Sequence, residues 1–146
     1  MKTHFVGLIL VSIILTGCGG TQESSLDTAL FQLSVNRGKW MAGAIHAYSF
    51  DYDVVSMLAS RPLHIEVRND LVAQVTDRTS GAVYSNAGAP TVDSLFTLVE
   101  RLVRSPSPDV TVTYDGQLGY PIKIENGSSI PDTGSTTTIS NFQQLP

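Results

Sequence analysis

Short segments of alternating residue type, joined by turn sequences, constrain the fold of this chain more than any other feature. Aromatic or apolar residues recur at every second position in 46–52, 63–67 and 110–114, as is typical of strands with one buried face. The pair Asn69-Asp70 follows the second segment directly, which predicts a tight hairpin into the next strand. Segments joined this closely pair antiparallel, because a parallel connection needs a dozen or more residues. We therefore expect an antiparallel sheet, with further strands at 71–76, 82–85, 120–125 and 136–142.

Two other segments have helical spacing. The clearer one follows Pro90, where Thr91 can cap the start and the Ser-Pro-Ser-Pro run at 105–108 ends the helix. An earlier helix is predicted to begin near Ser25 or Asp27. The apolar residues that we expect on the buried faces of the two helices are Leu26, Leu30, Leu33 and Trp40 in the first, and Val92, Leu95, Phe96, Val99, Leu102 and Val103 in the second.

The order of these elements predicts an α+β fold, with two helices packed on one face of an antiparallel sheet. A helix and three or four strands are followed by a second helix and three more strands. The same order fits two helix-plus-β-meander halves. The 146 residues, of which 42% are hydrophobic and 15% charged, suffice for one core. We place this single domain at 26–146.

The N-terminal residues indicate an exported lipoprotein precursor. Lys2 precedes an apolar run at 5–15, which is shorter than the roughly 20 residues of a membrane-spanning helix. The run ends in Leu15-Thr16-Gly17-Cys18, which resembles the lipobox of bacterial lipoproteins. That resemblance implies a signal peptide at 1–17, lipidation of Cys18 and a flexible tether at 18–25. The alternatives are an ordinary signal peptide with a chance cysteine, or a transmembrane anchor.

This segment also predicts where the protein is located. We expect the domain to be extracytoplasmic and attached to a bacterial membrane through its lipid. Gly19, in place of aspartate, is typical of lipoproteins sent to the outer membrane in hosts that have one. Cys18 is the one cysteine of the chain, so no intramolecular disulfide can form.

The charge of the chain argues against nucleic acid as a partner. Its formal net charge is -4, and removal of Lys2 with the signal makes it more negative by one unit. The lysines and arginines are scattered along the sequence, whereas binding to phosphates needs them clustered.

No catalytic constellation stands out. His46 and His64 lack the spacing of a metal-binding motif, and we interpret them as strand-face residues. Asp51 and Asp53 flank Tyr52, and we interpret them as solvent-facing strand ends. The sequence has neither a Gly-x-Ser-x-Gly motif nor a phosphate-binding glycine loop. We therefore predict no catalytic residue, metal or cofactor. The alternative is a small hydrolase or metal-dependent enzyme that uses these histidines with the two aspartates, or with Glu66.

A cluster of unusual residues marks the predicted hairpin after the second helix. Glycine permits positive φ, proline fixes φ, and tyrosine joins an apolar ring to a polar tip. Two interpretations stay open: a hairpin whose geometry needs these residues, or a binding edge that presents Tyr120 to a partner. The residues are Tyr114, Asp115, Gly119, Tyr120 and Pro121.

Several of these patterns together resemble a family of small bacterial lipoproteins, the domain of unknown function numbered six-one-seven-four. The residues that carry the resemblance are Trp40, Tyr48, Phe50, Asn69-Asp70, Thr91-Val92-Asp93-Ser94-Leu95-Phe96, Val112-Thr113-Tyr114-Asp115, Gly119-Tyr120-Pro121-Ile122-Lys123-Ile124 and the segment from Ile139 to Phe142. The chain departs from the family pattern in two ways. The first hairpin is Asn-Asp where Asp-Gly is usual, and a cysteine pair that many members carry is absent. The resemblance implies no activity.

The anchor and the missing catalytic constellation together predict a non-enzymatic domain of the cell envelope. We expect it to bind a protein, peptide or other envelope component through its sheet or through the hairpin from Tyr114 to Pro121. Besides the enzyme, the remaining alternative is a purely structural envelope protein.

Overall fold

The computed structural model describes residues 21–57, 59–84, 88–106, 109–127 and 134–146. The predicted signal peptide and Cys18 lie outside these residues, as do Ser85 of one predicted strand and most of the predicted turn between Asn126 and Gly134. Neither helix of the described part combines the length with the apolar character that a membrane crossing requires.

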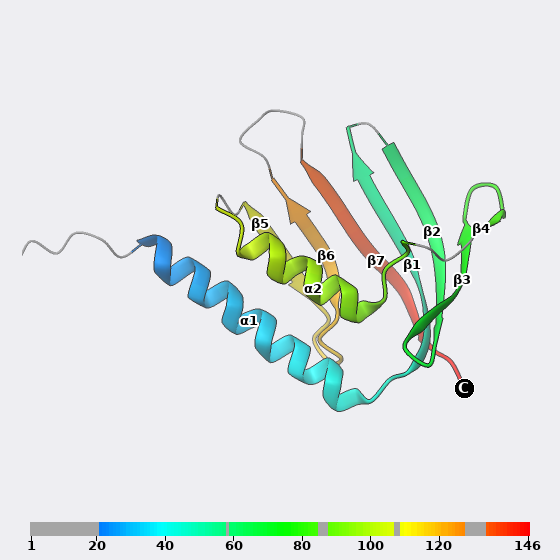
Figure 1. Cartoon of the computed structure of the whole chain (residues 1–146), viewed down its shortest axis with the longest axis horizontal. Coiled ribbons are helices and arrows are strands. Elements are labelled where there is room, and N and C mark those ends of the chain that lie inside the picture. The colour runs from blue at the N-terminus through cyan, green and yellow to red at the C-terminus, as the bar shows by residue number, and fades with distance from the viewer. Residues whose placement is uncertain (1–20, 58, 85–87, 107–108, 128–133) are drawn as a thin grey trace, which may run out of the picture.

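The structure has two helices and one seven-stranded antiparallel sheet, which confirms the α+β class (Figure 1). The strand order across the sheet is β4-β3-β2-β1-β7-β6-β5. The elements, in chain order, are α1 (Thr21–Gly43), β1 (Ala47–Ser56), β2 (Ala59–Arg68), β3 (Leu71–Asp77), β4 (Val83–Tyr84), α2 (Val92–Val103), β5 (Val110–Tyr114), β6 (Pro121–Asn126) and β7 (Ser135–Gln144).

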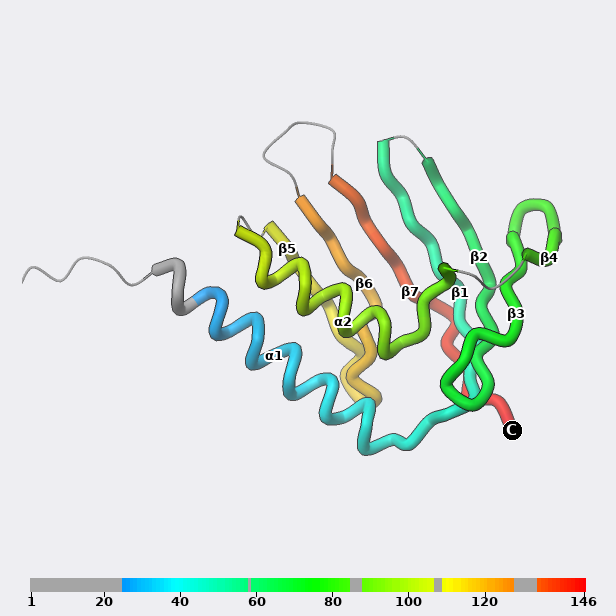
Figure 2. Tube along the Cα trace, viewed as in Figure 1, coloured from blue at the N-terminus to red at the C-terminus, as the bar shows by residue number. Residues whose placement is uncertain are grey.

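The sheet consists of two meanders joined at its middle. The first meander, β1 to β4, follows α1, and the second, β5 to β7, follows α2. They meet where β7 pairs with β1, with Tyr52 opposite Ile139. Figure 2 shows these two strands side by side although they lie far apart in the sequence. The topology therefore brings the C-terminal strand into the centre of the sheet.

The first predicted hairpin has the expected tight turn. Asn69 and Asp70 both have positive φ, at 51° and 64°, as the two central residues of a type I′ turn require. Asparagine and aspartate adopt this backbone conformation more readily than other residues with a side chain. An Asn-Asp pair therefore fits this turn without glycine.

Helix α1 begins earlier than its sequence pattern indicates. It starts at Thr21, so residues 21–25, which we assigned to a flexible tether, are helical. Leu33 and Trp40 are buried as predicted. Gly38 lies inside the helix and Gly43 ends it.

Helix α2 agrees with its predicted bounds and cap. The Thr91 side chain accepts a hydrogen bond from the Ser94 N–H, and this bond satisfies one of the donors that a helix start leaves unpaired. Figure 1 shows α2 crossing in front of β5 and β6. The buried residues of α2 are Val92, Leu95, Phe96, Val99 and Val103.

An aromatic cluster joins α1 to the centre of the sheet. The Trp40 ring packs edge-on against Tyr48 at 5.3 Å and against Phe142 at 5.9 Å, measured between ring centroids. Phe142 also stacks on Tyr120 at 4.6 Å. Edge-on and offset aromatic pairs contribute about 0.5–1.5 kcal/mol beyond the area they bury. These rings form the core where the two meanders meet.

Candidate functional site

The side of the sheet opposite the aromatic core carries a row of polar side chains. Side chains alternate along a strand, so Asp51 and Asp53 of β1 point away from the face that holds Tyr52. Residues paired across strands share a face, and Asp51 lies opposite His64 of β2 while Asp53 lies opposite Thr138 of β7. We call this side the polar face. It includes Asp51, Asp53, His64, Glu66, Lys123, Glu125, Thr136 and Thr138.

Asp51 is the centre of a charged cluster on the polar face. It lies in the middle of β1 and is only 8% exposed, so our prediction of a solvent-facing strand end was wrong for this residue. Its Oδ1 lies 2.8 Å from His64 Nδ1, and its Oδ2 accepts a hydrogen bond from Asn141 Nδ2 at 2.7 Å. These neighbours cover the carboxylate. The alternation of residue types along β1 does not reveal this cover, because it shows only which face a side chain is on.

An irregularity in β7 brings Asn141 to this carboxylate. Asn141 has a φ of 50°, and the pairing of β1 with β7 shifts between Ser49 and Asp51. Such a bulge redirects a side chain relative to the regular alternation. Sequence reasoning missed Asn141, because only the position of the bulge shows where its side chain points.

Arg78, directly after β3, connects the two aspartates. Its Nη1 donates to both carboxylate oxygens of Asp53, at 3.0 and 2.8 Å, and its Nε lies 3.4 Å from Asp51 Oδ2. The backbone N–H of Arg78 donates to the Pro62 carbonyl. Sequence reasoning missed this residue as well, since it lies 25 residues from Asp53 along the chain.

The environment of Asp51 favours its charged form. Burial alone would raise the pKa of the carboxyl group. The hydrogen bonds from Asn141 and His64 and the positive charge of Arg78 act in the opposite direction, and together they hold the Asp51 pKa below its usual value. The side chains of His64 and Arg78 are each 37% exposed. The cluster therefore combines a covered carboxylate with two groups that solvent or a partner can reach.

His46 does not take part in this cluster. It precedes β1 instead of lying on a strand face, and its Nδ1 lies 2.9 Å from Asp70 Oδ2. With Trp40 and Asp93 it lines a separate cavity of about 260 Å³. Within the part of the chain that the structure describes, no three histidine, cysteine or acidic residues are placed to hold a metal ion. The structure therefore does not bring the two histidines together in one cluster.

Hydrogen bonds within the Asp115 to Pro121 hairpin hold its backbone in place. Asp115 Oδ1 accepts hydrogen bonds from the N–H groups of Gln117 and Leu118, at 3.0 and 2.7 Å. The Gly119 N–H donates to the Asp115 carbonyl, and the Asp115 N–H donates to the Tyr120 carbonyl. Aspartate is favoured in turns because its side chain can accept from backbone groups two and three residues on.

The other residues of this hairpin face inward. Tyr120 is 8% exposed and belongs to the aromatic cluster. Tyr114 stacks on Phe96 of α2. Gly119 has a φ of 79°, and a Cβ atom there would overlap the backbone of Asn36 in α1. The structural interpretation thus accounts for these residues, since the Tyr120 ring is buried in the aromatic cluster.

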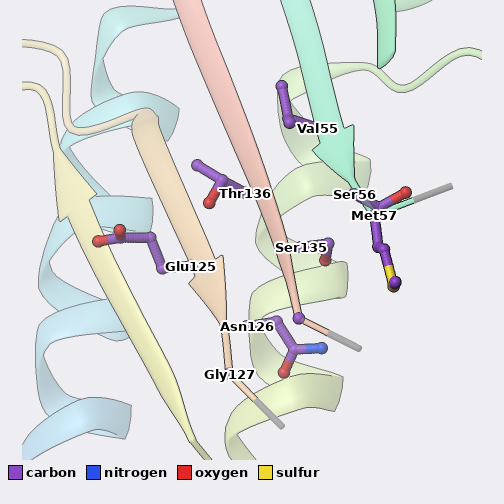
Figure 3. Close-up of a pocket in the computed structure, with 9 residues that line it drawn as sticks. Val55, Ser56, Met57, Glu125, Asn126, Gly127, Ser135 and Thr136 are labelled. Atoms are coloured by element: carbon purple, nitrogen blue, oxygen red, sulfur yellow. The ribbon is translucent and has the colours of Figure 1, made fainter. Parts of the chain in front are cut away.

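A shallow recess of about 590 Å³ lies at one end of the sheet, where β1 and β6 end and β7 begins (Figure 3). Figure 3 shows both helices behind these strands. Val55, Thr136 and Glu125 line the recess and are neighbours across β1, β7 and β6. Glu125 also forms an ion pair with Lys123 at 2.8 Å. The recess therefore continues the polar face toward the end of the sheet.

These features define a small α+β domain whose sheet carries a hydrogen-bonded charge cluster around a covered carboxylate. The chain belongs to a family of unknown function, DUF6174, whose model matches residues 32–144. This match confirms the family that the sequence resembles, and the bacterial and lipoprotein parts of that resemblance stay predictions. A comparison with curated proteins found no match.

The close approach of the hairpin to α1 predicts different effects of two glycine substitutions. Gly119→Ala should destabilise the protein by about 2 kcal/mol or more, because it adds backbone strain at positive φ to a steric overlap with Asn36. Gly116→Ala is the matched control, since a Cβ there meets nothing within 4 Å. Urea unfolding measures both values. Equal stabilities of the two variants would contradict the role assigned to Gly119.

The lowered pKa of Asp51 predicts a pH-dependent contribution to stability. The ionised carboxylate should stabilise the fold above about pH 4, where the unfolded chain is also ionised, and this contribution should disappear as pH falls through the lower folded-state pKa. Asp51→Asn should therefore cost about 1–3 kcal/mol at pH 7, with a smaller cost at pH 2 to 3. Urea unfolding across this pH range tests the expectation, with Asp27→Asn as the control for loss of one carboxylate. A cost for Asp51→Asn that does not change with pH would refute it.

Proposed function

We propose that this chain is a lipid-anchored domain of the bacterial cell envelope that binds a protein or peptide partner through the polar face, without catalysing a reaction. The observation that carries the proposal is the charge cluster of Asp51, Asp53, His64 and Arg78 near the centre of the sheet. Charged groups held in fixed positions select partners of complementary pattern, because like charges brought together on binding cost free energy.

The arrangement of the helices supports this choice of face. We infer that both helices pack on one side of the sheet, because both contact the same side chain. The Trp40 ring of α1 packs against the Tyr48 ring, and the Tyr48 hydroxyl accepts a hydrogen bond from the Val92 N–H at the start of α2. Asp51 and Asp53 point to the other side, which leaves the polar face available to a partner.

The mutual bonds within the cluster make the polar face rigid. Arg78 holds Asp53 through two hydrogen bonds, and its backbone is tied to Pro62. A binding surface on a sheet is positioned more firmly than one on a loop, and little side-chain freedom remains to be lost when a partner binds. Because the cluster carries both signs of charge, we propose a polar peptide segment with charges of both signs as the partner.

The proposed location rests on the sequence before the described residues. Leu15-Thr16-Gly17-Cys18 resembles a lipobox, and attachment of two or more acyl chains gives stable membrane binding where one chain does not. The protein would then act beside a bilayer, outside the cytoplasm and in the outer membrane of hosts that have one.

The anchor predicts a specific effect of Cys18→Ala. In the native host, this variant should lose incorporation of labelled palmitate and leave the membrane fraction, because the thiol that accepts the lipid is gone. Ser24→Ala is the control and should remain in the membrane fraction. Undiminished palmitate incorporation in Cys18→Ala would rule out lipidation at this residue.

The proposed binding surface predicts where a partner can be crosslinked. A photoreactive amino acid that replaces Lys123, on the polar face, should give a discrete crosslinked product in cells. The same amino acid in place of Thr97, an exposed residue of α2, should not. Arg78→Gln should reduce the product several-fold, whereas Arg101→Gln, which removes an equal charge from α2, should leave it unchanged.

Two results of this crosslinking experiment would contradict the proposal. Equal products from the Lys123 and Thr97 positions would show that the polar face has no special role. No product from the polar face would favour a purely structural envelope protein. Circular dichroism of Arg78→Gln distinguishes loss of binding from loss of fold.

A further inference from the structure

A third cavity lies on the other side of the sheet from the polar face, over the first meander. It has a volume of about 350 Å³ and extends from β1 to β4 and to the segment that leads into α2. Its walls include Leu63 and Val75, which are both buried, and Pro90. The volume falls at the lower end of the range of small-molecule sites. The cavity thus has room for one ring or a short acyl chain against the apolar part of its lining.

Polar groups accompany these apolar walls. Arg61, Tyr52 and Tyr84 also line the cavity. Arg61 is opposite Val54 of β1, which places its side chain on the same side of the sheet as Tyr52 and Leu63. Burial raises the pKa of the Tyr52 phenol above its usual value. A hydrogen bond with Thr137 and the nearby charge of Arg61 reduce this rise without cancelling it. A cation therefore lies near the Tyr52 phenol at a cavity whose lining is partly polar and partly apolar.

Arg61 has no acidic partner within the described part of the chain. By contrast, Arg37, Arg68, Arg78 and Arg104 each lie within 4.0 Å of a carboxylate oxygen. A guanidinium group has five donors whose geometry matches a carboxylate. Arg61 can therefore make with a ligand the ion pair that these four arginines make within the protein.

We propose that this cavity binds a small amphipathic monocarboxylate. Its apolar body would lie against Leu63, Val75 and Pro90, and its carboxylate would pair with Arg61. Arg61 supplies one positive charge, which can balance one carboxylate. A phosphate dianion would need more positive charge nearby, and the protein as a whole has a net charge of -4. The site is separate from the polar face, so the two proposals can fail independently.

The test is a titration followed by methyl NMR on the full chain. The probes are 3-phenylpropionate and octanoate, which distinguish an aromatic acid from an acyl chain as the apolar body. Their uncharged counterparts are 3-phenylpropanol and octanol. We expect at least one acid to shift the methyl signals of Leu63 and Val75 saturably. The matching alcohol should bind about tenfold more weakly, because it cannot form the charge-assisted hydrogen bonds with Arg61, and tenfold corresponds to about 1.4 kcal/mol.

Arg61→Met keeps an apolar stem and should weaken binding of the acid about tenfold, to the level of the alcohol. Arg101→Met is the matched control for loss of one positive charge and should bind the acid unchanged. Arg78→Gln, on the polar face, should also bind it unchanged. Equal binding of acid and alcohol, unchanged binding by Arg61→Met, or shifts confined to methyl groups away from the cavity would each overturn the proposal.

Discussion

The contact of Tyr48 with both helices is the interaction on which the rest of the structure depends. A helix start leaves several N–H groups without partners, and burial of such a group costs about 1–3 kcal/mol. The Tyr48 hydroxyl accepts the Val92 N–H at 3.0 Å, so α2 can begin inside the core. The ring of the same tyrosine supports Trp40 of α1. Burial raises the Tyr48 pKa to about 12, so the phenol stays protonated under ordinary conditions.

This arrangement leaves the two sides of the sheet chemically different. In the arrangement that we infer, aromatic and aliphatic side chains on one side join the helices to the strands, and the core there depends on close packing. The other side is held by hydrogen bonds and ion pairs around Asp51. A partner at the polar face could therefore bind without disturbing the hydrophobic core.

Much of the fold could be predicted because strand alternation and helical spacing are local properties of the sequence. The Asn69-Asp70 turn, the Thr91 cap and the inward position of Trp40 all follow from nearby residues. The order of the strands could not be predicted in the same way. Pairing of β7 with β1 joins segments about ninety residues apart, and no local pattern encodes it.

The candidate site was harder to predict for the same reason. Alternation placed Asp51 and Asp53 on one face but assigned Asp51 to solvent, because its covering groups come from three other segments. His64 lies opposite Asp51 on β2, and Arg78 follows β3. The Asn141 side chain points toward Asp51 because of a bulge in β7. The hairpin residues, by contrast, were recognised as unusual, and only the contact with Asn36 shows why Gly119 is needed.

The early start of α1 has a consequence for the geometry of the anchored protein. In the form that we propose, the described helix begins three residues after the acylated Cys18. The 23 residues of α1 then extend about 35 Å. The helix would serve as a stiff spacer that sets the height of the sheet above the lipid head groups. That height would depend mainly on the length of α1.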